Sequence, residues 1–325
     1  MLKSRCLGAL LFAGLGLGFN SIALPQTPYP AKPVRMLVGL AAGGGTDLVA
    51  RIIAPKLADA LGQPFVVENR VGAGGSIAAE FVARSAPDGY TLLFAPNGPM
   101  VINPTMFKQM PFSPVRDFTP VALAVTIPPL IAVNAGVPAR SIAELIDFLK
   151  KNVGKSNCGG AGPTFELAAR LFTGKTGTEC TFVQYKGSNE TAQALMSGDL
   201  QFAVIDTGPV FPAIQSGKVR GLAVTGPTRD PIFPDLPSVA EAGFPELEMR
   251  WWMGVFAPTG TPAAIVKRLE SEMLRVLKQP EVVKQLRNRQ TMPANMGSEE
   301  LARFLTSEIA RWDAVRKGAN IPQLD

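Results

Sequence analysis

The sequence predicts an α/β protein that is built as two lobes. Short apolar segments alternate with amphipathic segments of helical spacing, which is typical of parallel sheets covered by helices. Roughly 300 residues follow the N-terminal apolar segment, more than a single core usually holds. After two α/β units the chain returns to long helices, so we expect the first lobe to be discontinuous.

In the first lobe, the clearest expected element is a helix at Thr46–Leu61, which has apolar residues at a spacing close to 3.6. Pro55 predicts either a kink or a break within it. The other expected elements are strands at Val34–Leu40, Phe65–Glu68 and Thr91–Ala95, and a helix at Gly75–Arg84.

The second lobe and the tail continue the alternation. Ser141 is expected to cap a helix that begins at Ile142, and Val210–Gly217 is either helical or irregular. We expect the chain to cross between the lobes near residues 122–125 and again near residues 247–253. The first lobe then consists of residues 24–124 and 247–325, the latter with the C-terminal helices, and the second lobe of residues 125–246. The remaining expected strands are Leu130–Val133, Ser156–Cys158, Cys180–Tyr185, Gln201–Ile205, Val219–Val224 and Met249–Phe256, and the helices are Ile142–Lys150, Glu166–Thr173, Ala192–Ser197, Pro262–Lys278 and Ser298–Gly318.

Residues 1–23 have the pattern of a secretory signal peptide. Lys3 and Arg5 precede the apolar run Leu7–Phe19, and Ser21–Ala23 offers small residues at a cleavage point. The alternative is a membrane anchor, which would need roughly 20 apolar residues, more than this run provides. We therefore expect export to the periplasm, with Cys6 removed in the leader.

The composition is that of a globular protein, with 46% hydrophobic and 18% charged residues. The formal net charge of +6 falls to +4 when the two cations Lys3 and Arg5 are removed. The other Lys and Arg residues are scattered and form no basic run, so nucleic acid is not an expected partner.

Two cysteines, Cys158 and Cys180, remain after the leader. A strand-helix-strand pattern between them would bring the two strands close together, and an oxidising periplasm would allow a disulfide. The alternative is a pair of buried free thiols.

Several chemistries are excluded by absent residues. The sequence contains no histidine, which removes Ser-His-Asp triads, Cys-His pairs and histidine metal sites. Gly154–Ser156 and Gly174–Thr176 resemble the end of a phosphate-binding loop, but Leu149 and Ala169 stand where its first glycine belongs. Catalysis by carboxylates alone stays open as an alternative, although no pair of carboxylates has a spacing that argues for it. We expect no cofactor, no metal ion and no catalysis.

The loops that follow the strands carry the functional prediction, because ligands of open α/β sheets bind beyond the carboxyl ends of the strands. The loop after the first strand places glycines immediately before a helix, whose free N–H groups and dipole favour a carboxylate. The alternative is a tight turn capped by Thr46 or Asp47. The candidate binding residues of this loop are Ala42, Gly43, Gly44, Gly45, Thr46 and Asp47.

A second glycine-rich helix start lies in the other lobe, at Gly159–Thr164, and could face the first across a cleft. Its candidate binding residues are Gly162 and Thr164. Other strand ends add Asn97, Ser188 and Asp206. Asp206 could accept from an amine or hydroxyl of a ligand, or it could be an ordinary turn residue.

A series of short motifs resembles the Bug family, the periplasmic receptors of tripartite tricarboxylate transporters. The resemblance runs from about Tyr29 to the C-terminus. Its motifs include Tyr29–Arg35, Gly43–Asp47, Leu61–Pro64, Val67–Arg70, Gly72–Gly75, Ala86–Leu93, Ile102–Pro104, Tyr185–Gly187, Leu222–Thr225, Pro237–Gly243 and Phe256–Pro262.

The resemblance implies a periplasmic-binding-protein type II-like (Venus flytrap) fold, with two α/β lobes joined by a two-strand hinge. It also implies a monomer that binds a small organic carboxylate through the first loop and the facing lobe. The bound molecule would be a dicarboxylate or tricarboxylate, an acidic amino acid or an aromatic acid. The partner would be the membrane permease subunits or, for a sensing receptor, a sensor kinase. Glu166 replaces a histidine common in the family, and either favours an amine-bearing ligand or faces solvent.

Overall fold

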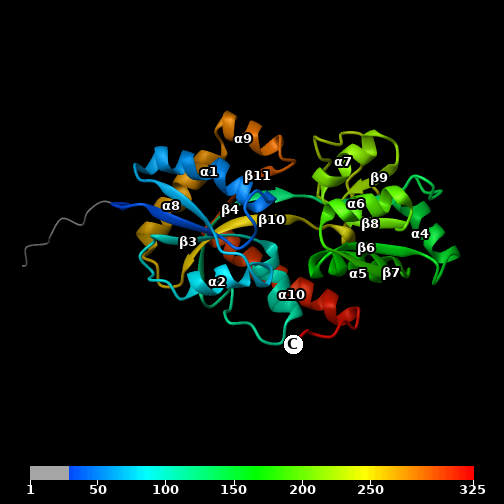
Figure 1. Ribbon diagram of the computed structural model, residues 1–325, viewed down its shortest axis with the longest axis horizontal. Coiled ribbons are helices and arrows are strands. Elements are labelled where there is room, and N and C mark those ends of the chain that lie inside the picture. The colour runs from blue at the N-terminus through cyan, green and yellow to red at the C-terminus, as the bar shows by residue number, and fades with distance from the viewer. Residues whose placement is uncertain (1–28) are drawn as a thin grey trace, which may run out of the picture.

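The computed structural model describes residues 29–325, which form two α/β lobes side by side (Figure 1). The predicted signal peptide lies outside the described residues. Within residues 29–325, no helix combines the length and apolar character needed to span a bilayer. The two-lobed α/β prediction is confirmed.

A six-stranded sheet forms the centre of lobe 1, in the order β11-β4-β10-β3-β1-β2. The first three strands pair in parallel, whereas the strands from the middle and end of the chain add antiparallel neighbours. The strands are β1 Val34–Val38, β2 Phe65–Asn69, β3 Thr91–Pro96, β4 Phe118–Ile127, β10 Trp251–Pro258 and β11 Met292–Gly297.

Lobe 2 is built on a five-stranded sheet in the order β7-β6-β8-β5-β9. Strand β6 pairs in parallel with β7 and β8, whereas β5 is antiparallel to β8 and β9. The strands are β5 Leu130–Asn134, β6 Asn157–Ala161, β7 Thr181–Tyr185, β8 Phe202–Ile205 and β9 Val219–Val224. Both sheets are therefore mixed, and the expectation of parallel sheets is wrong for β5, β9 and β10. Strands β4 and β11 were not predicted from the sequence.

Helices cover both faces of each sheet (Figure 1). In lobe 2 the faces follow the alternation of a strand: Leu130 and Ala132 pack with α6 and α7, whereas Ile131 and Val133 pack with α4 and α5. A single helix α1 continues through Pro55, so of the two alternatives predicted there, a kink or a break, the break is wrong. The helices are α1 Gly45–Leu61, α2 Ser76–Ala83, α3 Asn103–Met106, α4 Ile142–Lys151, α5 Pro163–Thr176, α6 Ser188–Ser197, α7 Thr207–Gln215, α8 Ala263–Leu277, α9 Pro280–Arg287 and α10 Ser298–Gly318.

The chain crosses between the lobes from β4 to β5 and again before β10. Thr225, at the end of β9, links these two crossings and is fully buried. Its hydroxyl lies 2.9 Å from the carbonyl oxygen of Pro129 and 2.8 Å from that of Met249. Its backbone N–H also donates to Pro129, and the N–H of Met249 donates to Thr225. The two connecting segments are thus held together at one residue.

Candidate functional site

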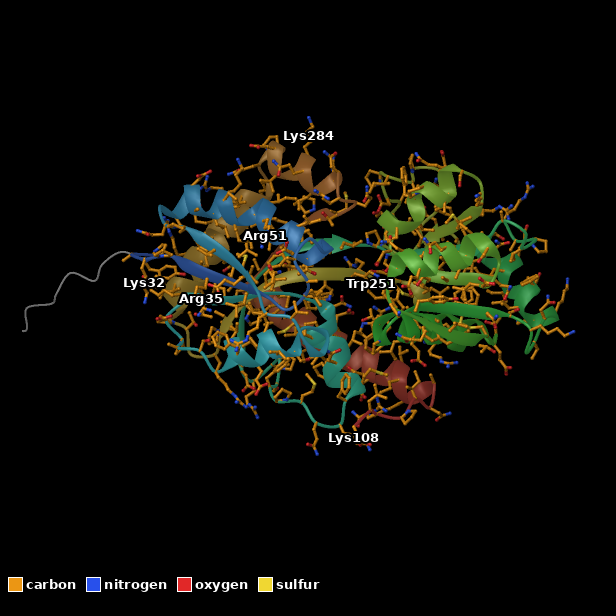
Figure 2. All side chains as sticks on the ribbon, viewed as in Figure 1. Lys32, Arg35, Arg51, Lys108, Trp251 and Lys284 are labelled. Atoms are coloured by element: carbon orange, nitrogen blue, oxygen red, sulfur yellow. A yellow bond between two sulfur atoms is a disulfide. The ribbon has the colours of Figure 1, made fainter. Side chains whose placement is uncertain are left out.

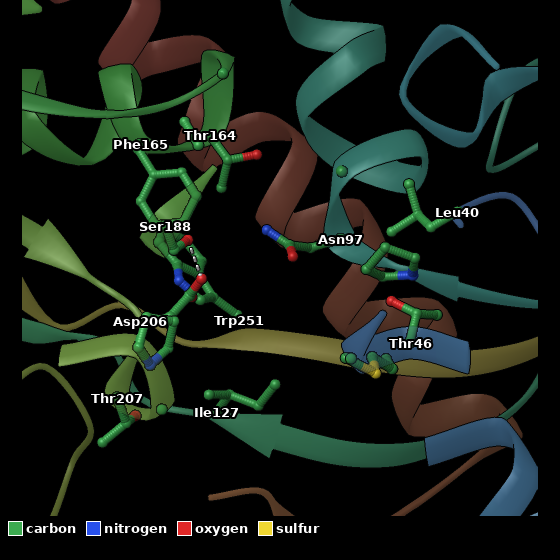
Figure 3. A pocket seen from close by; sticks show the side chains of 18 of the residues that line it. Leu40, Thr46, Asn97, Ile127, Thr164, Phe165, Ser188, Asp206, Thr207 and Trp251 are labelled. Carbon is green, nitrogen blue, oxygen red and sulfur yellow. Dashed lines mark hydrogen bonds between the residues drawn. The ribbon is translucent and has the colours of Figure 1, made fainter. Parts of the chain in front are cut away.

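A cleft of about 1240 Å³ lies between the lobes and is lined by residues from both. Figure 2 shows Trp251 in the span that joins the lobes, and Figure 3 shows the cleft from close by. The lining comes mainly from strand ends and from the helix starts that follow them, which is where ligands of α/β sheets bind.

Four helices begin at this cleft: α1, α5, α6 and α7. Their N-cap residues are Gly44, Gly162, Gly187 and Asp206, and none makes a side-chain capping hydrogen bond. By contrast, the Ser141 side chain caps α4 by accepting from the N–H of Glu144, as predicted. Because the first N–H groups of a helix have no partner within it, four sets of donors and four positive dipole ends meet at the cleft. Such an arrangement favours an anion.

In lobe 1, Gly45 and Thr46 line the cleft at the start of α1, and Asn97 lines it after β3. The other candidates from the first loop do not line it. Ala42 and Gly43 are exposed and Gly44 is half-buried, so this part of the loop lies outside the cleft lining.

Asp47 is buried, and its carboxylate holds the loop rather than facing the cleft. It accepts hydrogen bonds from the N–H of Gly43 at 2.9 Å, from Arg51 Nε at 2.9 Å and from Asn69 Nδ2 at 2.9 Å. The hydrogen bond from Arg51, with those from Gly43 and Asn69, lowers the pKa of Asp47 to about 2, against the opposing effect of burial. Its role in this geometry is to position the glycine loop.

Three side-chain N–H groups at the cleft have no hydrogen-bond partner in the described part of the chain: Asn97 Nδ2, Trp251 Nε1 and Trp252 Nε1. Asn97 is 5% exposed, and its amide extends from lobe 1 toward lobe 2 (Figure 3). Buried donors without partners are costly, so these groups are suited to a ligand that supplies acceptor atoms.

In lobe 2, all four candidates line the cleft: Gly162, Thr164, Ser188 and Asp206. Gly162 has a φ of 82°, which glycine adopts without strain. The Ser188 hydroxyl donates to Asp206 Oδ2 at 2.6 Å, linking the start of α6 to the end of β8 (Figure 3).

Burial raises the pKa of Asp206 above its ordinary value, and hydrogen bonding from Ser188 and the nearby Trp251 indole partly offsets this. The Trp251 Nε1 still lacks a partner with full hydrogen-bond geometry. Asp206 is half-buried and lines the cleft.

Several cleft residues were not predicted from the sequence. Phe165 packs edge-on against Trp251 with ring centroids 5.7 Å apart, so the start of α5 contacts the β10 crossing. Trp251 and Trp252 also line the cleft; they lie in the crossing expected near residues 247–253 and were not among the candidate binding residues. Arg289–Thr291, between α9 and β11, also lines the cleft. No local signal marks these residues, because distant parts of the chain bring them together.

Cys158 and Cys180 are joined by a disulfide, with their Cα atoms 5.8 Å apart. Glu166 does not line the cleft; its carboxylate lies 3.6 Å from the guanidinium of Arg170, one turn further along α5. No group of three or more His, Cys, Asp or Glu residues within residues 29–325 could hold a metal ion.

Two α/β lobes that enclose a cleft with helix N-termini define a solute-binding protein of the periplasmic type. Residues 49–321 match the model of the tripartite tricarboxylate transporter family receptor, so the chain belongs to this family. Among curated proteins, it is 32% identical over 311 residues to protein BugT of Bordetella pertussis, covering 94% of this chain and 95% of BugT. It is 35% identical over 287 residues to a UPF0065 protein of Pseudomonas sp. strain P51, covering 87% of this chain and 85% of that protein.

Solved structures agree with this assignment. The Rpa4515 protein of R. palustris, solved with adipate, is 35% identical with a TM-score of 0.78, over 91% of this chain and 100% of that one. MatC from Rhodopseudomonas palustris, solved with bound malate, is 33% identical with a TM-score of 0.73, over 88% and 99%. The periplasmic binding protein BugD is 32% identical with a TM-score of 0.75, over 91% and 100%. The predicted family and fold are confirmed.

Proposed function

We propose that this protein captures a small organic carboxylate in the interlobe cleft, in the periplasm, and delivers it to the membrane permease subunits of a tripartite transporter. It acts as a receptor and carries out no catalysis. The observation that carries the proposal is the convergence of four uncapped helix starts with three unpartnered side-chain donors. All of these groups belong to residues at one cavity, and a carboxylate would supply acceptors for them.

The surroundings of the cleft support an anionic ligand. Lys186 and Arg289 lie at the cleft and are exposed, whereas Asp47, the acidic residue nearest the start of α1, is already paired with Arg51. Two relatives with solved structures hold dicarboxylates, adipate in one and malate in the other. Both observations favour a carboxylate in this chain as well.

The test is a thermal-shift panel on the chain that follows the leader, followed by calorimetry on the best ligands. Each acid is paired with its neutral amide of the same skeleton. A ligand that binds only the folded state raises the melting temperature, by an amount set by its concentration relative to Kd. We expect acids to raise it and their amides not to. Equal shifts for acids and amides would contradict the proposal, and so would chemical conversion of a bound acid by the pure protein.

A matched pair of variants locates the site. Asn97→Asp replaces an unpartnered donor with a negative charge in the cleft, so affinity for the best acid should fall by about tenfold or more. Asn320→Asp makes the same change at an exposed residue outside the cleft and should leave affinity unchanged. An unchanged affinity in Asn97→Asp would place the ligand elsewhere.

A further inference from the structure

The cleft is unevenly equipped for hydrogen bonding. Its helix starts and its unpartnered Asn97 and tryptophan side chains all donate. Among residues 29–325, the carboxyl groups that line the same cavity are those of Glu190 and Asp206. Glu190 is exposed and accepts from the backbone N–H of Lys186 at 3.1 Å, so it is engaged at the surface of the lobe. Asp206 is therefore the carboxyl group that can meet a ligand inside.

One oxygen of Asp206 accepts a hydrogen bond of full geometry, and the Trp251 indole lies near the carboxyl group. Oδ2 accepts the Ser188 hydroxyl at 2.6 Å, and no hydrogen bond from the described residues reaches Oδ1. The side chain follows β8 and lies across the cleft from Asn97 (Figure 3). An acceptor oxygen that loses water without gaining a donor is costly, so a ligand that fills this cleft has to supply one.

We infer, building on the proposed function, that the ligand is a carboxylate that also carries a hydrogen-bond donor, a hydroxyl or an ammonium group, and that Asp206 Oδ1 accepts from this donor. The carboxylate lies among the N–H groups of the helix starts and Asn97. The donor lies at Asp206. Asp206 then determines which acids are bound tightly, while the helix starts bind any acid of suitable size.

Electrostatics support this orientation. A ligand carboxylate placed against the ionised form of Asp206 would bring two like charges together with little water to screen them, and so would raise the pKa of Asp206 further. The cations at the cleft, Lys186 and Arg289, are exposed and so are screened by solvent. A donor group avoids this repulsion, and an ammonium also offsets the burial that raises the pKa of Asp206.

The experiment uses acids of the same carbon skeleton that differ in one substituent: hydrogen, hydroxyl or ammonium. Succinate, malate and aspartate form one set, and propionate, lactate and alanine form another. Calorimetry on the unmodified protein should show that a donor-bearing member binds at least about tenfold tighter than the donor-free member of its set, which corresponds to one charged hydrogen bond. This measurement does not depend on any variant.

Variants then assign the preference to Asp206. Asp206→Ala removes the acceptor, so the ratio between donor-bearing and donor-free acids should fall to about one. Asp206→Asn keeps an acceptor oxygen but no charge, so an ammonium ligand should lose more affinity than a hydroxyl ligand. Asp147→Asn, at an exposed residue of α4, is the control and should keep the original ratio.

The inference is wrong if the donor-free acid of each set binds as tightly as its partners, or if no acid of either set binds. It is also wrong if the ratio survives in Asp206→Ala. In these cases the proposed function stands as long as other carboxylates in the wider panel bind. It fails as well only if the whole panel fails.

Discussion

Asp47 accepts the backbone N–H of Gly43 at 2.9 Å and thereby closes the loop that precedes α1. The same carboxylate pairs with Arg51, one turn along the helix, at 2.9 Å. A residue that the sequence suggested as a ligand contact is therefore part of the support that orients Gly45 and Thr46 toward the cleft. Its effect on binding is expected to be indirect, through the shape of the loop.

This support should depend on pH. Because the folded pKa of Asp47 is lowered from 3.8 to about 2, its charge stabilises the fold fully above pH 3.8 and less as the pH falls toward 2. The contribution is about 2 kcal/mol at neutral pH. Asp47→Asn should therefore lower the free energy of unfolding in urea by about that amount at pH 6, and by about half as much at pH 3. Asp59→Asn, on an exposed position of α1, is the control. A difference that does not change with pH would contradict the ion-pair explanation.

Thr225 should be the most sensitive threonine of the hinge region. The hydroxyl of Thr225 lies within hydrogen-bond distance of the carbonyl oxygens of Pro129 and Met249. Thr225→Val removes this hydroxyl at a fully buried position, so both oxygens lose a nearby donor. We expect a loss of about 1–3 kcal/mol in the free energy of unfolding. Thr306→Val, at an exposed threonine of α10 that bonds to its own helix, should change it by less than about 0.5 kcal/mol. Similar losses in both variants would argue against a special role for Thr225.

The disulfide should stabilise lobe 2. Cys158 and Cys180 are 22 positions apart in the sequence. The bond between them restricts the unfolded chain, and its loss should lower the free energy of unfolding by about 3 kcal/mol. A reductant should lower the melting temperature of the unmodified protein and have no effect on the Cys158→Ala, Cys180→Ala double variant. Equal melting temperatures for oxidised protein, reduced protein and double variant would show that the bond adds no stability.

The elements that the sequence predicted correctly are those with local signals. The helix at Thr46–Leu61 has its apolar spacing, and α5 begins after Gly162 with Pro163 in its first turn. Strand β11 lacks such a signal. It contains Pro293, its pairing with β4 shifts register after that residue, and it lies at the edge of the sheet. Strand orientation was predicted wrongly for a similar reason, since antiparallel neighbours come from distant parts of the chain.

The candidate site was predictable at the level of loops and not of individual atoms. Glycine before a helix start indicated α1 and α5, and both line the cleft. Which loop residues face the cavity depends on contacts such as that of Asp47 with Asn69, which are 22 positions apart. The unpartnered N–H groups of Trp251 and Trp252 depend on how β10 lies between the lobes, and spacing in the sequence carries no information about this.

Strand β6 and the start of α5 make a close contact at Gly160 and Phe165. A Cβ atom at Gly160 would lie 2.3 Å from the Cβ of Phe165, which is far closer than carbon atoms approach, and Phe165 lines the cleft against Trp251. Gly160→Ala should therefore displace Phe165 and the first turn of α5. Because Gly162–Phe165 line the cleft, affinity for the best acid should fall by about tenfold, a loss measurable by calorimetry.

Gly174→Ala provides the matched control. Gly174 lies near the other end of α5, outside the cleft, and a Cβ atom added there has no atom within 4 Å. The substitution should raise the free energy of unfolding by about 0.5–1 kcal/mol, because alanine loses less backbone entropy than glycine in a helix. It should not change affinity. If Gly160→Ala kept full affinity while folding normally, the first turn of α5 would not be a contact of the ligand, and the ligand would have to be held by the other three helix starts.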